Sequence, residues 1–359
     1  MWSNLLILAV GLVLLTGGAE ALVRGASRIA VRFGIPSLIV GLTIVAFGTS
    51  APEFAVSIVA AWSDQADIAL GNVVGSNIFN VLFILGLSAL IVPLAISSQL
   101  IRVDVPLMIG ASILVLFFAL DGHIGRIDGA ILFVGLLAYT GFQIRQGLRE
   151  RNASTGGETP TDLASRPWWS DLILVLGGLV VLVIGSRLLV TSAVDIARVL
   201  GVSELVIGLT IVAAGTSLPE LATSVIASIR GERDIAVGNV VGSNVFNLLG
   251  VLGLASLVSP SGIEVARQAL QFDIPVMIAV AVACLPIFVT GRKIARWEGG
   301  LFFAYYLAYT TYVVMAALQH AALDLYGTAM LGFVLPLTAV TLLVLFARDH
   351  LGRRDSSGH

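Results

Sequence analysis

The sequence is poor in cysteine and histidine, the residues that disulfide-stapled domains and many metal centres depend on. It has one cysteine and four histidines in 359 residues. The single cysteine, Cys284, excludes an internal disulfide and a thiolate-clustered metal site. The histidines His123, His320, His350 and His359 lie at the edges of apolar runs or in the tail. They form no cluster of metal ligands, and we expect no bound cofactor.

Charged residues are also scarce, and this scarcity decides the class of protein. They make up 12% of the chain, whereas an average soluble domain has about 25%. The net charge of -2, from 20 basic and 22 acidic residues, gives no basic excess that would point to nucleic acid. Apolar residues reach 57% and the mean hydropathy is +1.00. A water-soluble core cannot absorb so much apolar sequence, so we expect an all-α polytopic membrane protein.

Apolar runs long enough to cross a bilayer of roughly 30 Å recur along the chain. We expect spans at residues 4–24, 36–61, 68–94, 103–120, 126–145, 171–192, 203–228, 236–258, 272–290, 298–319 and 327–347. A polar, turn-forming stretch separates the fifth span from the sixth. The predicted organisation is therefore a first membrane repeat at 1–145, a cytoplasmic linker at 146–169, a second membrane repeat at 170–319, and an additional transmembrane helix with a basic cytoplasmic tail at 320–359.

Two motifs occur twice, which indicates an internal duplication. The segment GLTIVAFGTSAPE at 41–53 recurs as GLTIVAAGTSLPE at 208–220, and DIALGNVVGSNIFN at 67–80 recurs as DIAVGNVVGSNVFN at 234–247. Both copies are offset by 167 residues, as Glu53 and Glu220 show. Each half holds five predicted spans. Because five is odd, the halves must be inverted relative to each other, as in many secondary transporters.

The basic residues predict the orientation of the chain, because Arg and Lys are enriched in short cytoplasmic loops. With the N-terminus outside and the tail inside, most basic residues fall on the cytoplasmic side. Only Arg126, Arg187, Arg198 and Arg267 fall on the other side. We therefore expect a multi-pass protein of the plasma (inner) membrane whose eleventh span returns the basic tail to the cytoplasm.

Glu53 and Glu220 are the most informative residues, because a charge inside an apolar span costs at least ~2.5 kcal/mol on insertion scales. No basic residue lies within either span, so a mobile cation or a proton is the natural partner. A lone intramembrane glutamate can be merely structural, but its duplication within one motif disfavours that interpretation. Thr49 and Ser50 share a helix face with Glu53 and add oxygen atoms.

A proline precedes each of these glutamates. Pro52 and Pro219 lack a backbone N–H, so we expect each helix to be kinked or opened just before its glutamate. Irregular backbone at membrane depth is tolerated where it lines a polar cavity. Carbonyl oxygens near Ala46 and Ala213 are therefore candidate ligands.

The second motif places a polar stripe on each of two further helices. Its residues recur at intervals of four, as Asn72, Ser76 and Asn80 in the first half and Asn239, Ser243 and Asn247 in the second. Asn72 and Asn239 can be explained as hydrogen-bonding glue between helices, whereas the other four lie closer to mid-span. Carboxylate, hydroxyl, amide and carbonyl oxygens form a hard donor set that suits Ca²⁺ or Na⁺.

These paired motifs resemble the repeats of the calcium/cation antiporter superfamily, most closely prokaryotic sodium/calcium exchangers, over residues 1–319. The resemblance implies ten helices in two inverted halves around one central cation site. It also implies that the first and sixth spans act as gates. Carried over by position, it implies a ligand set of Ala46, Thr49, Ser50, Glu53, Ser76, Asn80, Ala213, Thr216, Ser217, Glu220, Ser243 and Asn247.

One departure bears on the transport cycle. Such exchangers often carry an aspartate at one of the positions held here by Asn80 and Asn247. Two carboxylates neutralise one Ca²⁺ or two Na⁺, so a third Na⁺ would leave a net positive charge.

We expect a secondary active antiporter, and not an enzyme, that exchanges Ca²⁺ for Na⁺ by alternating access. Its expected partners are these ions and membrane lipid, with no obligate protein partner. The alternatives are a proton-coupled exchanger of Ca²⁺ or another divalent cation on the same fold, a cation channel, or a membrane scaffold that does not transport.

Overall fold

The computed structural model describes residues 2–63, 65–153 and 167–341, and these residues are almost entirely helical. Within them, nine helices are long and apolar enough to cross a membrane. Two further pairs of helices, each bent at a short break, raise the number to eleven when each pair is taken as one span. Eleven is the predicted number. Residues 154–166 of the expected linker, and the tail with the end of the expected eleventh span at 342–359, lie outside the described residues.

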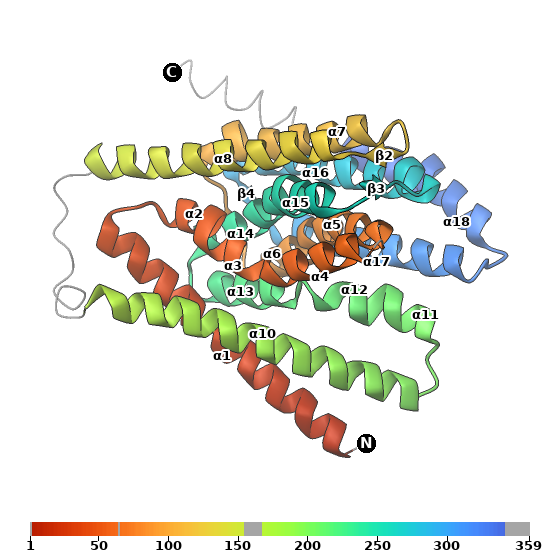
Figure 1. Ribbon diagram of the computed structural model, residues 1–359, viewed down its shortest axis with the longest axis horizontal. Helices are drawn as coiled ribbons and strands as arrows, with labels where there is room; N and C mark the ends of the chain where they lie inside the picture. Colours follow the sequence, from red (N-terminus) through yellow and green to blue (C-terminus); the bar gives the residue numbers. More distant parts are fainter. Residues whose placement is uncertain (1, 64, 154–166, 342–359) are drawn as a thin grey trace.

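Each half contains five membrane spans, several of them divided into shorter helices, and Figure 1 shows their arrangement. The first half contains α1 (Trp2–Phe33), α2 (Ser37–Val40), η1 (Gly41–Val45), α3 (Ala46–Thr49), α4 (Ala51–Trp62), α5 (Ala66–Phe79), η2 (Asn80–Leu85), α6 (Gly86–Ile91), η3 (Leu100–Asp104), α7 (Val105–Ala119) and α8 (Arg126–Ala153). The second half contains α10 (Trp168–Val199), α11 (Glu204–Ile207), η4 (Gly208–Val212), α12 (Ala213–Gly215), α13 (Leu218–Ile229), α14 (Arg233–Val245), η5 (Phe246–Val251), α15 (Leu252–Val258), η6 (Ala269–Asp273), α16 (Ile274–Val289), η7 (Thr290–Arg292) and α17 (Arg296–Ala317). The eleventh span begins with α18 (Leu323–Ala329) and η8 (Met330–Val334).

Turns of π-helix recur at equivalent places in both halves. The segments η1, η2 and η3 of the first half correspond to η4, η5 and η6 of the second. Two of the three pairs fall within or directly after the duplicated motifs. Short π-helical turns inside α-helices are frequent at functional sites, so the backbone irregularity itself marks the motif helices.

Two short antiparallel ladders join the halves. Strand β1 (Leu94–Ala95) pairs with β4 (Lys293–Ile294), and β2 (His123–Ile124) pairs with β3 (Ile263–Glu264). The loop after the third span thus meets the loop before the tenth, and the loop after the fourth meets the loop before the ninth. Eleven alternating spans place each of these loop pairs on one face of the membrane, so both ladders agree with the predicted inversion.

Helices α1 and α10 are longer than the expected spans 4–24 and 171–192. Helix α1 continues to Phe33 because apolar residues at helical spacing, Ala26, Ile29 and Ala30, extend its buried face beyond the apolar run. Helix α10 likewise continues to Val199. The expected fifth span ended at residue 145, whereas α8 runs on to Ala153.

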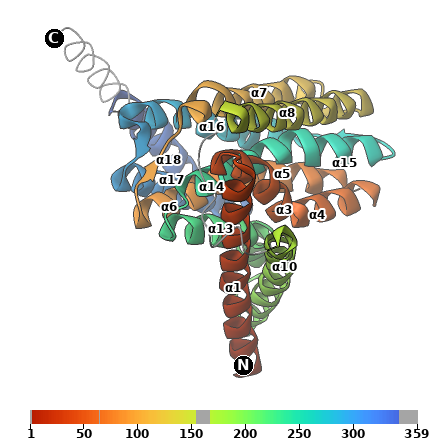
Figure 2. The ribbon, with the colours of Figure 1, turned by 90° about the vertical axis from the view of Figure 1, so that its left-hand side faces the viewer.

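Helices α1 and α10 cross each other at pairs of glycines. They lie side by side at one side of the molecule in both views (Figures 1 and 2). A Cβ atom added at Gly18 would lie 2.6 Å from the backbone nitrogen of Leu182, and one at Gly185 would lie 2.5 Å from that of Leu15. Only glycine permits this approach, so the two backbones are in direct contact.

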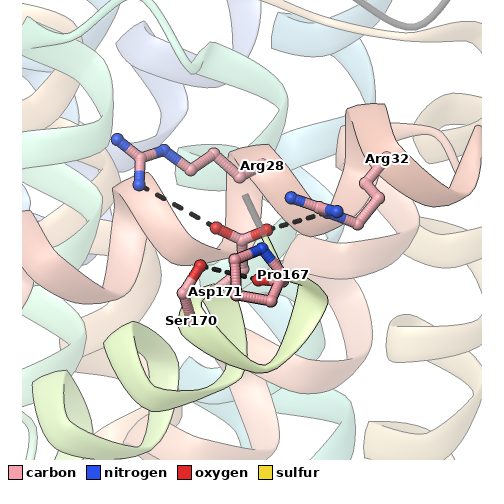
Figure 3. Close-up of polar contacts among 5 residues, drawn as sticks. All are labelled: Arg28, Arg32, Pro167, Ser170 and Asp171. Carbon is pink, nitrogen blue, oxygen red and sulfur yellow. Dashed lines mark hydrogen bonds and ion pairs between the residues drawn. The ribbon is translucent and has the colours of Figure 1, made fainter. Parts of the chain in front are cut away.

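A buried ion pair fixes the end of α1 to the start of α10 (Figure 3). Asp171 is fully buried, and one of its carboxylate oxygens lies 3.0 Å from Nε of Arg32. Its other carboxylate oxygen lies 3.9 Å from Nη1 of Arg28. The carboxylate therefore lies between two arginines one helical turn apart, and α1 and α10 are linked by charge as well as by close packing.

The third and eighth spans form the centre of the molecule. Most of the apolar stretch of 233–258 and of 68–91 is buried, whereas none of that in the eleventh span is. The duplicated asparagines and serines lie on these two central spans, and the two bent pairs pack beside them. The fold thus brings both copies of both motifs to the middle of the described structure.

Candidate functional site

Two bends place the glutamates at the centre. Helix α3 ends at Thr49 and α4 begins at Ala51, with a bend of 46°, and α12 and α13 are separated by a bend of 62°. Pro52 and Pro219 lie in the first turn of the helix after each break, where a missing N–H leaves no helical bond unmade. Each glutamate therefore lies in a helical first turn, where the positive end of the helix dipole favours a negative charge.

The two carboxylates are bound reciprocally by the two halves. Glu53 and Glu220 are both 0% exposed. Ser217 of the second half donates a hydrogen bond to Oε1 of Glu53 at 2.8 Å, and Ser50 of the first half donates one to Oε1 of Glu220 at 2.9 Å. The Ser217 hydroxyl also lies 3.1 Å from that of Ser76. The two motifs thus build one site across the interface between halves.

Asn72 and Asn239 connect the glutamate helices to the central spans. Asn72 donates to the Ser57 hydroxyl at 2.9 Å and to the backbone carbonyl of Glu53 at 3.4 Å. Asn239 makes the equivalent contacts in the second half at 2.9 and 3.3 Å. Its Oδ1 also accepts a hydrogen bond from Thr49 at 3.0 Å. These asparagines therefore position the residues of the site.

Several side-chain oxygens of the motifs are buried and have no hydrogen-bond partner within the part of the chain that the structure describes. They are Oε2 of Glu53, Oδ1 of Asn80, Oε2 of Glu220, Oγ of Ser243 and Oδ1 of Asn247. A buried acceptor without a partner costs about 1–3 kcal/mol, and more when it is charged. Carboxylate, hydroxyl and amide oxygens of this kind are the ligands that hard cations prefer, so these five atoms could bind one.

The prolines suggested that the backbone carbonyls near Ala46 and Ala213 are free to bind an ion, but the Ala46 carbonyl has protein partners. The carbonyl of Ala46 accepts the backbone N–H of Ser50 at 3.0 Å and lies 3.3 Å from the hydroxyl of Thr49. The helix therefore continues through Ser50 before it bends. To bind an ion, the Ala46 carbonyl would have to give up its contact with the Thr49 hydroxyl. Ala213 is exposed, and the nearby carbonyl of Gly215 accepts a hydrogen bond from Ser186 of α10 at 3.0 Å.

The two equivalent interfaces beside the site are packed differently. A Cβ added at Gly238 would lie 2.9 Å from the carbonyl of Leu38, and one at Gly242 would lie 2.8 Å from the Cβ of Ala46. Among the described residues, nothing lies within 4 Å of such an atom at the counterparts Gly71 and Gly75. The structure is therefore closed where α14 meets the first bent pair and loose where α5 faces the second.

Other polar residues of the spans lie away from this site. Asp104 accepts hydrogen bonds from Gln143 at 2.6 Å and Tyr139 at 3.2 Å, and Asp273 accepts one from Tyr309 at 3.0 Å. These contacts give both aspartates a structural role.

Four polar residues near the site escaped the sequence analysis. They are Ser57, Asn77, Ser224 and Asn244. Each serine follows its glutamate by one helical turn, and each asparagine is duplicated within the second motif. The duplication was therefore a signal for all four. Asn77 and Asn244 each follow the middle serine of a polar stripe by one residue, so they do not fit its four-residue interval.

The chain matches the family model described as "Sodium/calcium exchanger protein" over residues 3–145 and 170–315. It is 43% identical over 312 residues to the putative antiporter CaxA of Alkalimonas amylolytica, which covers 84% of this chain and 95% of that protein. It is 33% identical over 342 residues to the sodium/calcium exchanger MaX1 of Methanosarcina acetivorans, covering 85% and 97%.

A solved structure of the sodium-calcium exchanger NCX_Mj, soaked with 10 mM Na⁺ and zero Ca²⁺, is similar throughout. The TM-score is 0.74 at 30% sequence identity, and the match covers 88% of this chain and 98% of that one.

Proposed function

Because the chain belongs to the sodium/calcium exchanger family, a family of membrane antiporters, we propose that it exchanges Ca²⁺ for Na⁺ by alternating access at one central oxygen-lined site. The observation that carries the proposal is the reciprocal contact between halves. Ser217 donates to Glu53, and Ser50 donates to Glu220. Each carboxylate keeps its second oxygen buried and unpartnered. Two negative charges and several neutral oxygens suit one Ca²⁺ or two Na⁺.

The proposed ligands come from both halves and follow the two copies of the duplicated motifs. They are the carbonyls of Ala46 and Ala213 and the side chains of Thr49, Ser50, Glu53, Ser76, Asn80, Thr216, Ser217, Glu220, Ser243 and Asn247. Among the described residues, no group of three or more His, Cys, Asp and Glu side chains is gathered. The ions therefore bind mainly to hydroxyl, amide and carbonyl oxygens around two carboxylates.

The unequal packing beside the site supports alternating access. The close contact at Gly242 seals one route to the site, and the open space at Gly75 leaves the equivalent route loose. Inverted repeats that exchange these two packings open the site to the other face. Helices α1 and α10 are the proposed gates. With no cation bound, the two carboxylates cross poorly, and this enforces exchange.

The proposed location is the plasma (inner) membrane, with the N-terminus outside and the tail inside. The basic residues support this orientation. In the proposed organisation, repeats at 1–145 and 170–319 are joined by a cytoplasmic linker at 146–169, and the eleventh span at 320–359 carries the tail. In this orientation the closed interface at Gly242 faces the cytoplasm and the loose interface at Gly75 faces outward.

Uptake of ⁴⁵Ca²⁺ into proteoliposomes, with the gradients of Na⁺, H⁺ and K⁺ varied one at a time, tests the coupling ion. The proposal predicts uptake that requires an outward Na⁺ gradient. Uptake driven by a pH gradient without Na⁺ would replace it with proton-coupled exchange. Flux that is independent of any counter-ion would indicate a channel instead.

A further inference from the structure

Four buried asparagines, two from each half, contact one another across the centre of the molecule. We name Asn77, Asn80, Asn244 and Asn247 the amide quartet. Asn80 Nδ2 donates to Oδ1 of Asn244 at 2.9 Å, and Asn247 Nδ2 donates to Oδ1 of Asn77 at 3.1 Å. Each bond joins a proposed ion ligand of one half to a residue of the other half that is not in the ligand set.

Backbone carbonyls fix the direction of these bonds. Nδ2 of Asn77 lies 3.3 Å from the backbone carbonyl of Asn244, and Nδ2 of Asn244 lies 3.4 Å from that of Asn77. A carbonyl oxygen can only accept a hydrogen bond. The amide nitrogens of Asn77 and Asn244 must therefore face these carbonyls, and their Oδ1 atoms must face the other two asparagines.

The orientation of the proposed ligands follows from this arrangement. Since Asn77 presents an acceptor to Asn247, Asn247 must answer with its NH₂ group, and its Oδ1 must point the other way. The same holds for Asn80 opposite Asn244. The Oδ1 atoms of Asn80 and Asn247 are indeed buried without a partner. The quartet thus presents two neutral oxygens, one from each half.

We propose that Asn77 and Asn244 are positioning residues that turn the oxygens of Asn247 and Asn80 toward the transported cation. The inference rests on the proposed function, because it assumes that a cation binds between the halves. Groups that orient a metal ligand typically change metal affinity by about 10–100-fold when they are removed. The arrangement also selects amides, because a carboxylate at position 247 would place an acceptor against Oδ1 of Asn77.

Simple packing is the competing explanation. Asn77 and Asn80 lie one helical turn apart in the first half, as Asn244 and Asn247 do in the second, and buried amides often hold helices together. Packing alone predicts that Asn77→Ala and Asn244→Ala lower the stability of the protein and leave its Ca²⁺ affinity unchanged. Positioning predicts dependence between the halves, pairing Asn77 with Asn247 and Asn244 with Asn80.

Double-mutant cycles on Ca²⁺ binding separate the two explanations. The dissociation constant for Ca²⁺ is measured on the purified full-length protein for single and double alanine variants. Asn77→Ala is expected to weaken binding about tenfold or more. Adding it to Asn247→Ala is expected to change nothing further, while adding it to Asn80→Ala should multiply the two effects. The cycle of Asn244→Ala with Asn80→Ala repeats the test independently if one variant folds poorly.

Multiplying effects between Asn77 and Asn247, with dependence between Asn77 and Asn80, would overturn the inference. A second contrary result is a lowered melting temperature for both Asn77→Ala and Asn244→Ala with unchanged Ca²⁺ affinity, which would make them packing residues only. Failure of the unsubstituted protein to bind Ca²⁺ would overturn the proposed function together with the inference. Binding without Na⁺-driven uptake would overturn the coupling ion alone.

Discussion

At the residue scale, each site carboxylate is divided between two tasks. One oxygen of Glu53 accepts a hydrogen bond from Ser217 of the other half, and the second is buried and unpartnered. Glu220 is arranged in the same way around Ser50. The serines hold the carboxylates in place and tie the halves together, so a change at one serine affects a carboxylate that lies far away in the sequence.

Replacing Ser217 with alanine removes a hydrogen bond to a charged group, which is worth about 1.5–3 kcal/mol. The Ca²⁺ dissociation constant of Ser217→Ala should therefore rise about tenfold or more. The matched control is Ser228→Ala on the same helix, because the Ser228 hydroxyl binds only the carbonyl of Ser224 among its described contacts. Equal affinities of the two variants would show that the bond to Glu53 is unimportant.

The sequence predicted which residue types meet at the site but not how they are paired. The duplicated motifs singled out Glu53 and Glu220, because a charge in an apolar span is costly unless a partner compensates it. Periodicity could not show that Asn77 faces Asn247, since that contact crosses between halves. It also could not show that Ser50 still donates its N–H to Ala46. The first feature depends on the relative placement of helices, which no spacing encodes. The second depends on where the helix bends before Pro52, which the proline alone does not fix.

At the element scale, the glycines of the central spans show which of the two equivalent helix interfaces is closely packed. A Cβ at Gly242 would clash with Ala46, whereas one at Gly75 would meet nothing within 4 Å. If the repeats exchange packings during transport, Gly75 must take the place that Gly242 has now. The smallest added side chain is then tolerated in one state and forbidden in the other.

Gly75→Ala should therefore keep its Ca²⁺ affinity but transport about 5- to 160-fold more slowly. Overpacking costs about 1–3 kcal/mol, and each 1.36 kcal/mol is tenfold in rate. Gly110→Ala is the control, because Gly110 also has open space around it and lies on α7. Equilibrium binding and initial ⁴⁵Ca²⁺ uptake measure the two quantities. Transport by Gly75→Ala at the rate of the control would argue against the exchange of packings.

The ion pair between α1 and α10 should contribute to stability. Asp171→Asn removes the charge that faces Arg32, and breaking a buried pair costs 3–5 kcal/mol in a fully buried setting. The Arg28 and Arg32 side chains keep some exposure, 30% and 15%, so we expect a loss of about 1–3 kcal/mol. The melting temperature of the purified protein measures it.

Asp195→Asn is the matched control for this prediction. Asp195 also pairs with an arginine on α10, Arg198, at 3.7 Å, but both side chains are about half exposed. Exposed pairs contribute about 0–1 kcal/mol. A melting temperature that falls as far for Asp195→Asn as for Asp171→Asn would show that burial of the Asp171 pair is not what matters.

Length and apolar composition predicted the number of spans, but not where α1 and α10 end. Their ends depend on partners. Beyond the apolar run, the buried face of helix α1 packs through Ala26, Ile29 and Ala30, and Arg28 and Arg32 also meet Asp171 of the other half. The π-helical turns were also beyond prediction, because one extra residue in a helical turn leaves composition and periodicity almost unchanged.

At the scale of the whole molecule, inversion gives one site with two charges, one from each half. One Ca²⁺ or two Na⁺ neutralise them, and a third Na⁺ would leave a net positive charge in a buried site. The amides at Asn80 and Asn247 add no charge. A cycle that exchanges one Ca²⁺ for two Na⁺ is the one in which both loaded states are neutral.

Exchange should therefore be insensitive to the membrane potential. Moving one net charge is worth about 2.3 kcal/mol per 100 mV, so an electrogenic cycle responds strongly to a potential clamped with K⁺ and valinomycin. We expect Na⁺-driven ⁴⁵Ca²⁺ uptake to change less than about twofold when the membrane potential changes by about 100 mV. A large acceleration by inside-negative potential would indicate a different stoichiometry.

The central claim is that Glu53 and Glu220 share one cation, and Na⁺-driven ⁴⁵Ca²⁺ uptake by Glu53→Gln and Glu220→Gln tests it most directly. Each variant removes half of the charge of the site while keeping its size. The account predicts that either substitution abolishes uptake, while Glu232→Gln, whose carboxylate accepts from Ser27 away from the site, transports normally. Full transport by both site variants would contradict it.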